Sequence, residues 1–233
     1  VIDNLGASVP SAANVDGDGD VDVIDRIIVS GRLGNQINPD LPITDPETLG
    51  EPRITDFDVN RNQDQRSFLR YIDTELSSDA VAAEIAASLG DGDASNDRIE
   101  LRRYELDGSG DGEVIDLADY LAATDRVLRI DFGSGGVGGN GNSTDADGYY
   151  ALGLDIDGDG TFDNIRNFHR LLGDVTGDGR VNVLDRITVE LGLRFGDNPE
   201  ADANGDGRVN VIDRIRVEQN LTRSINGDLK RDD

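Results

Sequence analysis

A twelve-residue pattern that occurs three times limits what this chain can fold into more than any other feature of its sequence. Residues 174–185 read DVTGDGRVNVLD, residues 202–213 read DANGDGRVNVID, and residues 14–25 read NVDGDGDVDVID. Each copy has oxygen-bearing side chains at alternate positions, glycine at position 6 and valine at position 8. A loop that supplies oxygens from positions 1, 3, 5, 7, 9 and 12 wraps around a Ca²⁺ ion, and the glycine permits its sharp turn.

The residues at these positions are the types that a hard cation prefers. The 174 loop offers Asp174, Thr176, Asp178, the carbonyl of Arg180, Asn182 and Asp185. The 202 loop offers Asp202, Asn204, Asp206, the carbonyl of Arg208, Asn210 and Asp213. The first loop offers Asn14, Asp16, Asp18, the carbonyl of Asp20, Asp22 and Asp25. A single match could be a solvated acidic turn, but three matches in the same register favour calcium.

Two further acidic segments fit the pattern less completely. Residues 155–163 read DIDGDGTFD and offer Asp155, Asp157, Asp159, the carbonyl of Thr161 and Asp163. The alternating apolar run before this segment predicts a β-hairpin whose turn holds calcium, with a plain acidic turn as the alternative. Residues 107–119 offer Asp107, Ser109, Asp111, Glu113, Asp116 and Asp119 if one extra residue is accommodated. The helix-like run 98–106 before them predicts a unit close to a complete EF-hand.

The composition excludes several classes of function. The chain has 48 acidic and 22 basic residues among 233, a formal charge of −26, which argues against binding to nucleic acid or anionic membranes. It has no apolar run of the roughly 18 residues that a membrane span needs. It has no cysteine, so disulfides and thiol chemistry are excluded. The single histidine, His169, lies on a strand-like run and is interpreted as a packed residue.

The segment Gly173–Leu221 resembles a type I dockerin domain, in which two calcium loops, each followed by one helix, pack together as F-hand modules. Over about 50 residues, two copies carry the same residue types in register: Asp, Asn or Thr, Asp, Gly, Val, Asn and Asp. The segment 14–34 resembles a third, isolated module. The resemblance implies calcium-dependent folding and docking onto a cohesin through the loop ends and helices.

Carried onto this sequence, the docking face of the family includes Val183, Leu184, Val211 and Ile212. This apolar pair in each module departs from the small hydroxyl residues that cellulosomal dockerins often carry there. Leu184, Ile187 and Leu191 also fall at helical spacing, which favours packing in a core over docking to a partner.

The remaining patterns predict a mainly α fold with a small β part: several calcium-loop–helix modules plus a small antiparallel hairpin or sheet. Helices are expected at 67–76 and 79–89, and a strand at 127–132. We expect an N-terminal module with a proline-rich connection (1–52) and a helical EF-hand-like region (53–132). After them we expect a Gly-rich loop with the calcium hairpin (133–172), the dockerin-like pair (173–222) and a charged tail (223–233).

These features predict a non-catalytic, calcium-stabilised interaction module of a secreted bacterial protein, at the cell surface or outside the cell. About five Ca²⁺ ions would reduce the charge from −26 to about −16. The expected partner is a cohesin-like or other extracellular protein. The alternative is a self-associating subunit of a filament or surface layer, with copies of the chain as partners, and a glycoside hydrolase fragment is least favoured.

Glycans are possible at the sequons of Asn142 and Asn220. The start at Val1 without Met favours a mature exported chain.

Overall fold

The computed structural model describes residues 52–90, 93–196 and 198–225. The chain divides into two compact units, residues 1–49 and 50–233, and all described residues belong to the second. The predicted calcium loop at 14–25 and the proline-rich connection therefore lie outside the described residues.

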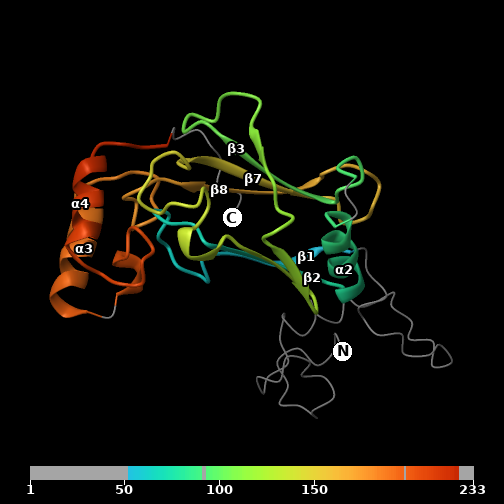
Figure 1. The fold of residues 1–233 in the computed structure, drawn as a ribbon, viewed down its shortest axis with the longest axis horizontal. Coiled ribbons are helices and arrows are strands. Elements are labelled where there is room, and N and C mark those ends of the chain that lie inside the picture. The colour runs from blue at the N-terminus through green and yellow to red at the C-terminus, as the bar shows by residue number, and fades with distance from the viewer. Residues whose placement is uncertain (1–51, 91–92, 197, 226–233) are drawn as a thin grey trace, which may run out of the picture. The chain divides into compact units, whose positions relative to one another are not determined.

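The described part of the chain is built on two four-stranded antiparallel sheets (Figure 1). The first sheet has the strand order β1-β2-β6-β5, formed by Ile54–Val59, Tyr71–Leu76, Val127–Asp131 and Leu121–Thr124. The second has the order β4-β3-β7-β8, formed by Glu113–Ile115, Ile99–Tyr104, Gly148–Leu154 and Asn164–Arg170. The strands β1, β5, β4 and β8 are thus the edges of the sheets.

The two sheets share one hydrophobic core, which makes the arrangement a β-sandwich. Ile72 and Leu76 of β2 belong to the same buried cluster as Leu101 of β3 and Leu152 of β7. Between the layers the rings of Phe57 and Phe168 lie 6.1 Å apart. A sandwich requires side chains that point alternately into the core and outward along its antiparallel strands.

The predicted mainly α fold is wrong, because the described residues form two four-stranded antiparallel sheets, and the region 53–132 contains six strands and one α-helix. The expected helix at 67–76 is a loop followed by β2, the helix-like run 98–106 contains β3, and the strand predicted at 127–132 is present as β6. In β2 every second side chain points into the core, at Ile72, Thr74 and Leu76. The apolar spacing of four residues that suggested a helix therefore also fits a strand, in which the side chains alternate with a period of two. Residues 107–112 are accordingly a hairpin loop between β3 and β4, with no helix on either side.

Three α-helices accompany the sheets in the described residues: α2 (Asp79–Ser88), α3 (Val183–Phe195) and α4 (Val211–Asn220). Ser78 caps α2 by accepting from the backbone N–H of Val81, as the predicted helix at 79–89 requires. The helices α3 and α4 pack on each other over a second small core that includes Val181, Val189 and Val217. None of the described helices combines the length and apolar character needed to cross a membrane.

Candidate calcium loops and docking module

The loop 174–185 is organised around two buried carboxylates. Asp174 accepts hydrogen bonds from the backbone N–H groups of Asp178 (3.2 Å) and Gly179 (3.0 Å). Asp185 accepts from the N–H groups of Thr176 (3.0 Å) and Asn182 (2.8 Å), and it also belongs to the first turn of α3. The carboxylate oxygens of Asp174, Asp178 and Asp185 come within 4.8 Å of one another. An all-oxygen set of this size fits Ca²⁺.

The loop 202–213 repeats this arrangement one module later. Asp202 accepts from the N–H groups of Gly205 (2.9 Å) and Gly207 (2.7 Å), and Asp213 accepts from those of Asn204 (3.3 Å) and Asn210 (2.8 Å). Both helices start with a capping box, Asn182 with Asp185 and Asn210 with Asp213. The acids of this loop do not form a group within 4.8 Å, unlike those of the 174 loop.

In both modules the remaining predicted ligands lie beside these carboxylates. The N–H groups of Arg180 and Arg208 donate to Asp178 and Asp206, and the side-chain amides of Asn182 and Asn210 donate to the same two acids. Asp178 and Asp206 are exposed, so the open side of each loop faces solvent.

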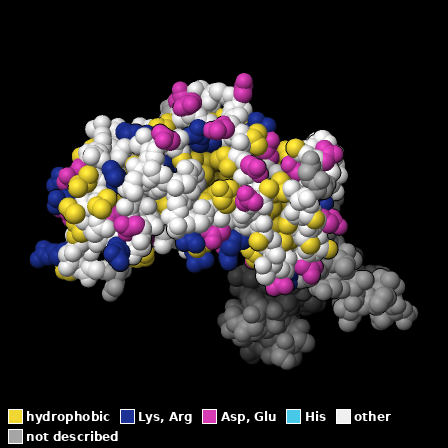
Figure 2. Space-filling view, in the orientation of Figure 1, with side chains coloured by type: hydrophobic (Ala, Val, Ile, Leu, Met, Phe, Trp, Pro, Cys, Tyr) yellow, Lys and Arg dark blue, Asp and Glu magenta, His cyan; other side chains and the backbone are white. Residues whose placement is uncertain are grey.

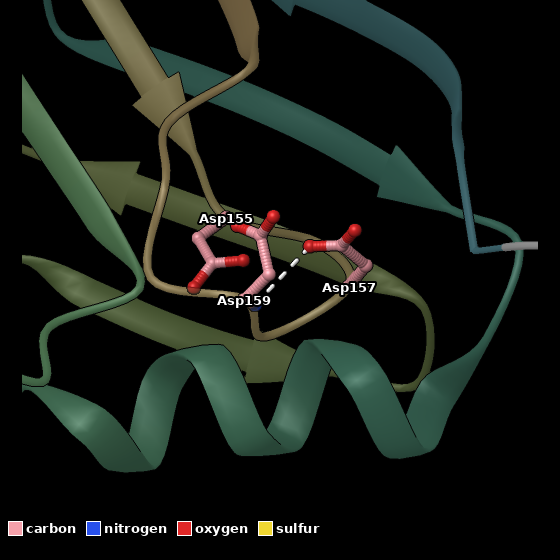
Figure 3. Close-up of side chains that lie close together, drawn as sticks. All are labelled: Asp155, Asp157 and Asp159. Atoms are coloured by element: carbon pink, nitrogen blue, oxygen red, sulfur yellow. Dashed lines mark hydrogen bonds between the residues drawn. The ribbon is translucent and has the colours of Figure 1, made fainter.

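The turn of the β7–β8 hairpin forms a third oxygen cluster (Figure 3). Asp155 is buried and accepts from the N–H groups of Gly158 (2.7 Å) and Gly160 (3.0 Å). Its carboxylate lies within 4.8 Å of those of Asp157 and Asp159, while Thr161 donates to Asp159. The predicted hairpin is therefore present, with its acids facing one another at the turn.

The structure does not bring the acids of 107–119 together in this way. Glu113 lies on β4 and pairs with Arg103 (2.6 Å), Asp107 accepts from the N–H of Ser109, and Asp116 accepts from that of Ala118. No residue of this segment belongs to a group of three close acids in the described structure. A calcium site there stays a prediction.

Burial raises the pKa of three predicted ligands above the ordinary value of an aspartate. The pKa of Asp202 rises to about 6, chiefly by desolvation, and Asp213 and Asp206 nearby add like-charge repulsion. Desolvation also raises the pKa of Asp185 and Asp213. Several carboxylates held close together without a cation therefore resist ionisation, and a bound divalent cation would relieve this repulsion.

The residues 66–68, before β2, anchor the two helical modules to the sandwich. The hydroxyl of Ser67 donates to the carbonyl of Ala203 (2.5 Å) and accepts from the N–H of Gly173 (2.7 Å). The N–H of Arg66 donates to the carbonyl of Asp174 (2.8 Å). The ring of Phe68 leaves no room for a side chain at Gly205, where an added Cβ would lie 2.2 Å from Phe68 Cδ1.

An ion cluster makes a second link between the modules and the sandwich. Asp147, buried in the loop before β7, accepts from Arg170 of β8 (2.7 Å) and from Arg223 beyond α4 (2.5 Å). Desolvation raises the pKa of Asp147, although the two arginines oppose that change. No residue spacing in the sequence signals this cluster or the role of Ser67, because the partners are far apart in the chain.

The outer faces of α3 and α4 are apolar and exposed, which corrects the prediction that they pack in a core. Nine of the twelve exposed large hydrophobic side chains of the described residues lie on these two helices, and eight of them are on the outer faces: Val183, Leu184, Ile187, Leu191, Phe195, Val211, Ile212 and Ile215. We call this surface the α3–α4 face. The core contacts of the helices are made instead by Val189 and Val217, which are fully buried. Figure 2 shows the hydrophobic side chains of this end of the molecule interspersed with arginines.

The two sequons differ in accessibility. Asn142 is exposed, and its side-chain oxygen accepts from Arg216 (2.8 Å). Asn220 is buried at the end of α4, and its amide donates to the carbonyl of Arg216 (2.8 Å).

Comparison with known families assigns the helical modules. Residues 172–222 match the family described as Dockerin type I domain, which confirms the resemblance predicted from the two calcium loops. This part of the chain is a calcium-binding protein–protein interaction module. No curated protein and no solved structure matches the chain significantly.

Proposed function

We propose that the chain is a calcium-dependent docking protein that acts outside the cell and binds a cohesin-like partner through the α3–α4 face. The observation that carries the proposal is the concentration of exposed apolar side chains on the two helices that follow the calcium loops. Exposed apolar patches of this kind mark interaction sites, because water around them is released on binding. Dockerins occur in extracellular or cell-surface proteins and are assembly modules, so the proposed role of this module is non-catalytic.

We infer three calcium sites within the described residues, at 155–163, 174–185 and 202–213. In each loop the first carboxylate is held by backbone N–H groups, and in the 155 and 174 loops three carboxylates already lie within 4.8 Å of one another. The 14–25 loop repeats the same ligand pattern in sequence. Because Asp185 and Asp213 belong to both a loop and a helix, a bound ion would fix the start of each helix and hence the α3–α4 face.

The docking proposal can be tested with an immobilised type I cohesin as the probe and biolayer interferometry in millimolar calcium. The wild type should bind, and chelation should abolish binding. The double variant Leu184→Asp/Ile212→Asp should lose binding because it places one charge on the exposed apolar surface near the start of each helix. Val114→Asp is the matched control, since Val114 is as exposed (53%) as Leu184 (55%) but lies on β4. Equal binding by all three proteins would contradict the proposal.

A second candidate function is self-association into a filament or surface layer. Its support is the same set of exposed apolar side chains on α3 and α4, which a second copy of the chain would cover in such an assembly.

A further inference from the structure

A groove runs along the outer edge of strand β4. Two hollows of about 570 Å³ and 650 Å³ meet at this strand, because both are lined by Val114, Ile115 and Asp116. One hollow extends toward the ring of Tyr120, the other toward the start of β3 and the turn of the β7–β8 hairpin. We call the two hollows together the β4 groove.

Acidic residues are concentrated in the β4 groove. Eight of them line it: Asp93, Asp97, Glu100, Glu113, Asp116, Asp119, Asp145 and Asp155. Its one basic lining residue in the described structure is Arg103, which is already paired with Glu113 (2.6 Å). The rest of residues 52–171 contains 17 acids and 10 arginines, so the excess of acid is much larger in the groove than around it. Negative charge gathered in this way attracts a positively charged partner.

Three acids of the groove are available for new ion pairs. Asp116, Asp119 and Asp145 are exposed, and none of them has a basic partner among the described residues. All three line the hollow beside Tyr120. A lysine or arginine of a partner would therefore pair with them without breaking an existing ion pair. One exposed pair contributes little, but several in one groove act together.

The β4 groove also offers apolar contact and a free sheet edge. Val114 is 53% and Tyr120 41% exposed, and they are two of the three exposed large hydrophobic side chains that the described residues carry outside α3 and α4. Figure 2 shows hydrophobic side chains in the space between the two sheets, bordered by acidic ones. In the described structure β4 pairs only with β3, so the backbone groups along its outer edge can pair with an added strand.

These features together favour a basic polypeptide as the occupant. Charges along an edge strand usually keep other chains away. Here they have one sign, so they repel acidic chains, including further copies of this chain with its formal charge of −26, and attract basic ones. Successive side chains of a strand point to opposite sides. A strand that alternates apolar and basic residues can thus direct one row toward Val114 and Tyr120 and the other toward the carboxylates.

We propose that the β4 groove binds an extended, basic segment of a partner protein, which joins the sheet as a strand beside β4. The groove shares no residue with the α3–α4 face, so the inference goes beyond the proposed function. It gives the chain a second docking surface, on the sandwich, whose partner is chosen by its positive charge.

Fluorescence anisotropy on the full chain in millimolar calcium tests the proposal, with a labelled peptide of alternating lysine and valine, seven residues long, as the probe. The peptide should bind, and more weakly as the salt concentration rises. The same peptide with glutamate in place of lysine should not bind. With proline in place of valine the charge is kept, but the peptide cannot add to a sheet, so its affinity should be at least about tenfold lower.

A groove variant and a matched control locate the binding site. Asp116→Asn/Asp119→Asn/Asp145→Asn removes the three charges without a basic partner and should weaken peptide binding about tenfold. The control Asp56→Asn/Glu105→Gln/Asp125→Asn removes the same charge from exposed positions outside the groove and should bind like the wild type. Far-UV circular dichroism confirms that both variants are folded.

Three outcomes would each overturn the proposal: no binding of the lysine–valine peptide, equal affinity of the groove variant and the wild type, or equal affinity of the proline and valine peptides. The first would also be seen if calcium occupied the acids of 107–119, and the third would show attraction by charge without an added strand. The face variant Leu184→Asp/Ile212→Asp should bind the peptide like the wild type. The cohesin experiment therefore tests the proposed function separately from this inference.

Discussion

The Nε2 atom of His169 lies 2.8 Å from Oδ2 of Asp174, so the end of strand β8 is hydrogen-bonded to the first carboxylate of the calcium loop that follows it. Both side chains are buried. Between them the chain passes only through Arg170–Gly173, of which Arg170 is bound to Asp147. The dockerin module is therefore joined to the sandwich without a spacer, and calcium binding in the loop should affect the sheet.

The first prediction is that calcium stabilises the sandwich together with the helices. At calcium one hundred times the dissociation constant, each site adds about 2.7 kcal/mol to the free energy of unfolding. Thermal unfolding followed by far-UV and tyrosine near-UV circular dichroism should give one transition, which chelation shifts to lower temperature for both signals. A sandwich signal unaffected by chelation would contradict this coupling.

Phe68→Ala should destabilise the chain by about 3–5 kcal/mol, because it empties the contact between the sandwich and the 202–213 loop. Phe68 is buried, and an added Cβ at Gly205 would lie against its ring. Phe195→Ala is the matched control: this ring is 70% exposed, so the change should stay within about 0.5 kcal/mol. Urea unfolding of both variants in calcium measures the difference, and similar losses in the two would be inconsistent with the described packing.

Asp147→Asn should cost about 3–5 kcal/mol, because it leaves the buried Arg170 without its counter-charge. The control is Asp73→Asn, which removes a pair with the partly exposed Arg129 and should cost about 1 kcal/mol or less. Chemical denaturation of both variants compares the two values. If Asp147→Asn is as mild as Asp73→Asn, the ion cluster does not hold the module to the sandwich.

The stability of the calcium-free chain should depend on pH in the opposite sense to that of the loaded chain. The pKa of Asp202 is about 6 in the fold, above its unfolded value, so its stabilising contribution is complete below the unfolded pKa and is lost as the pH rises through about 6. In EDTA, Asp202 should therefore contribute more to the midpoint of unfolding at about pH 4.5 than at about pH 7. In calcium the order should reverse, because ligands must be deprotonated. Asp202→Asn should reduce both effects, and an unchanged pH profile in this variant would assign them to other groups.

The parts of the structure that could be predicted from sequence are those whose signals are local. The spacing of Asp174, Gly179 and Asp185 defines a loop and the start of a helix within twelve residues, and the alternation around Asp155 defines a hairpin. In both cases the ligands and the turn residues are neighbours in the chain. A short sequence can therefore specify such a site.

The sandwich could not be predicted in the same way. Ile72 pairs across the sheet with Ile130, and Leu101 with Leu152, each more than fifty residues away. Phe68, Ile72 and Leu76 follow one another at a spacing of four residues, which fits a helix and a strand equally well, and only the distant pairing decides. The sequence could not predict that Leu184 and Ile187 are exposed, because helical spacing identifies the apolar face of a helix but not what covers that face.

Calorimetric titration with Ca²⁺ tests the central claim most directly, since the proposed docking depends on ion binding in these loops. Asp174→Asn and Asp202→Asn should each lower the number of bound ions by one relative to the wild type, and Asp155→Asn should do the same. Asp56→Asn, an exposed acid outside the loops, should leave the number unchanged. An ion count that is the same in the wild type and in the Asp174→Asn and Asp202→Asn variants would contradict the account.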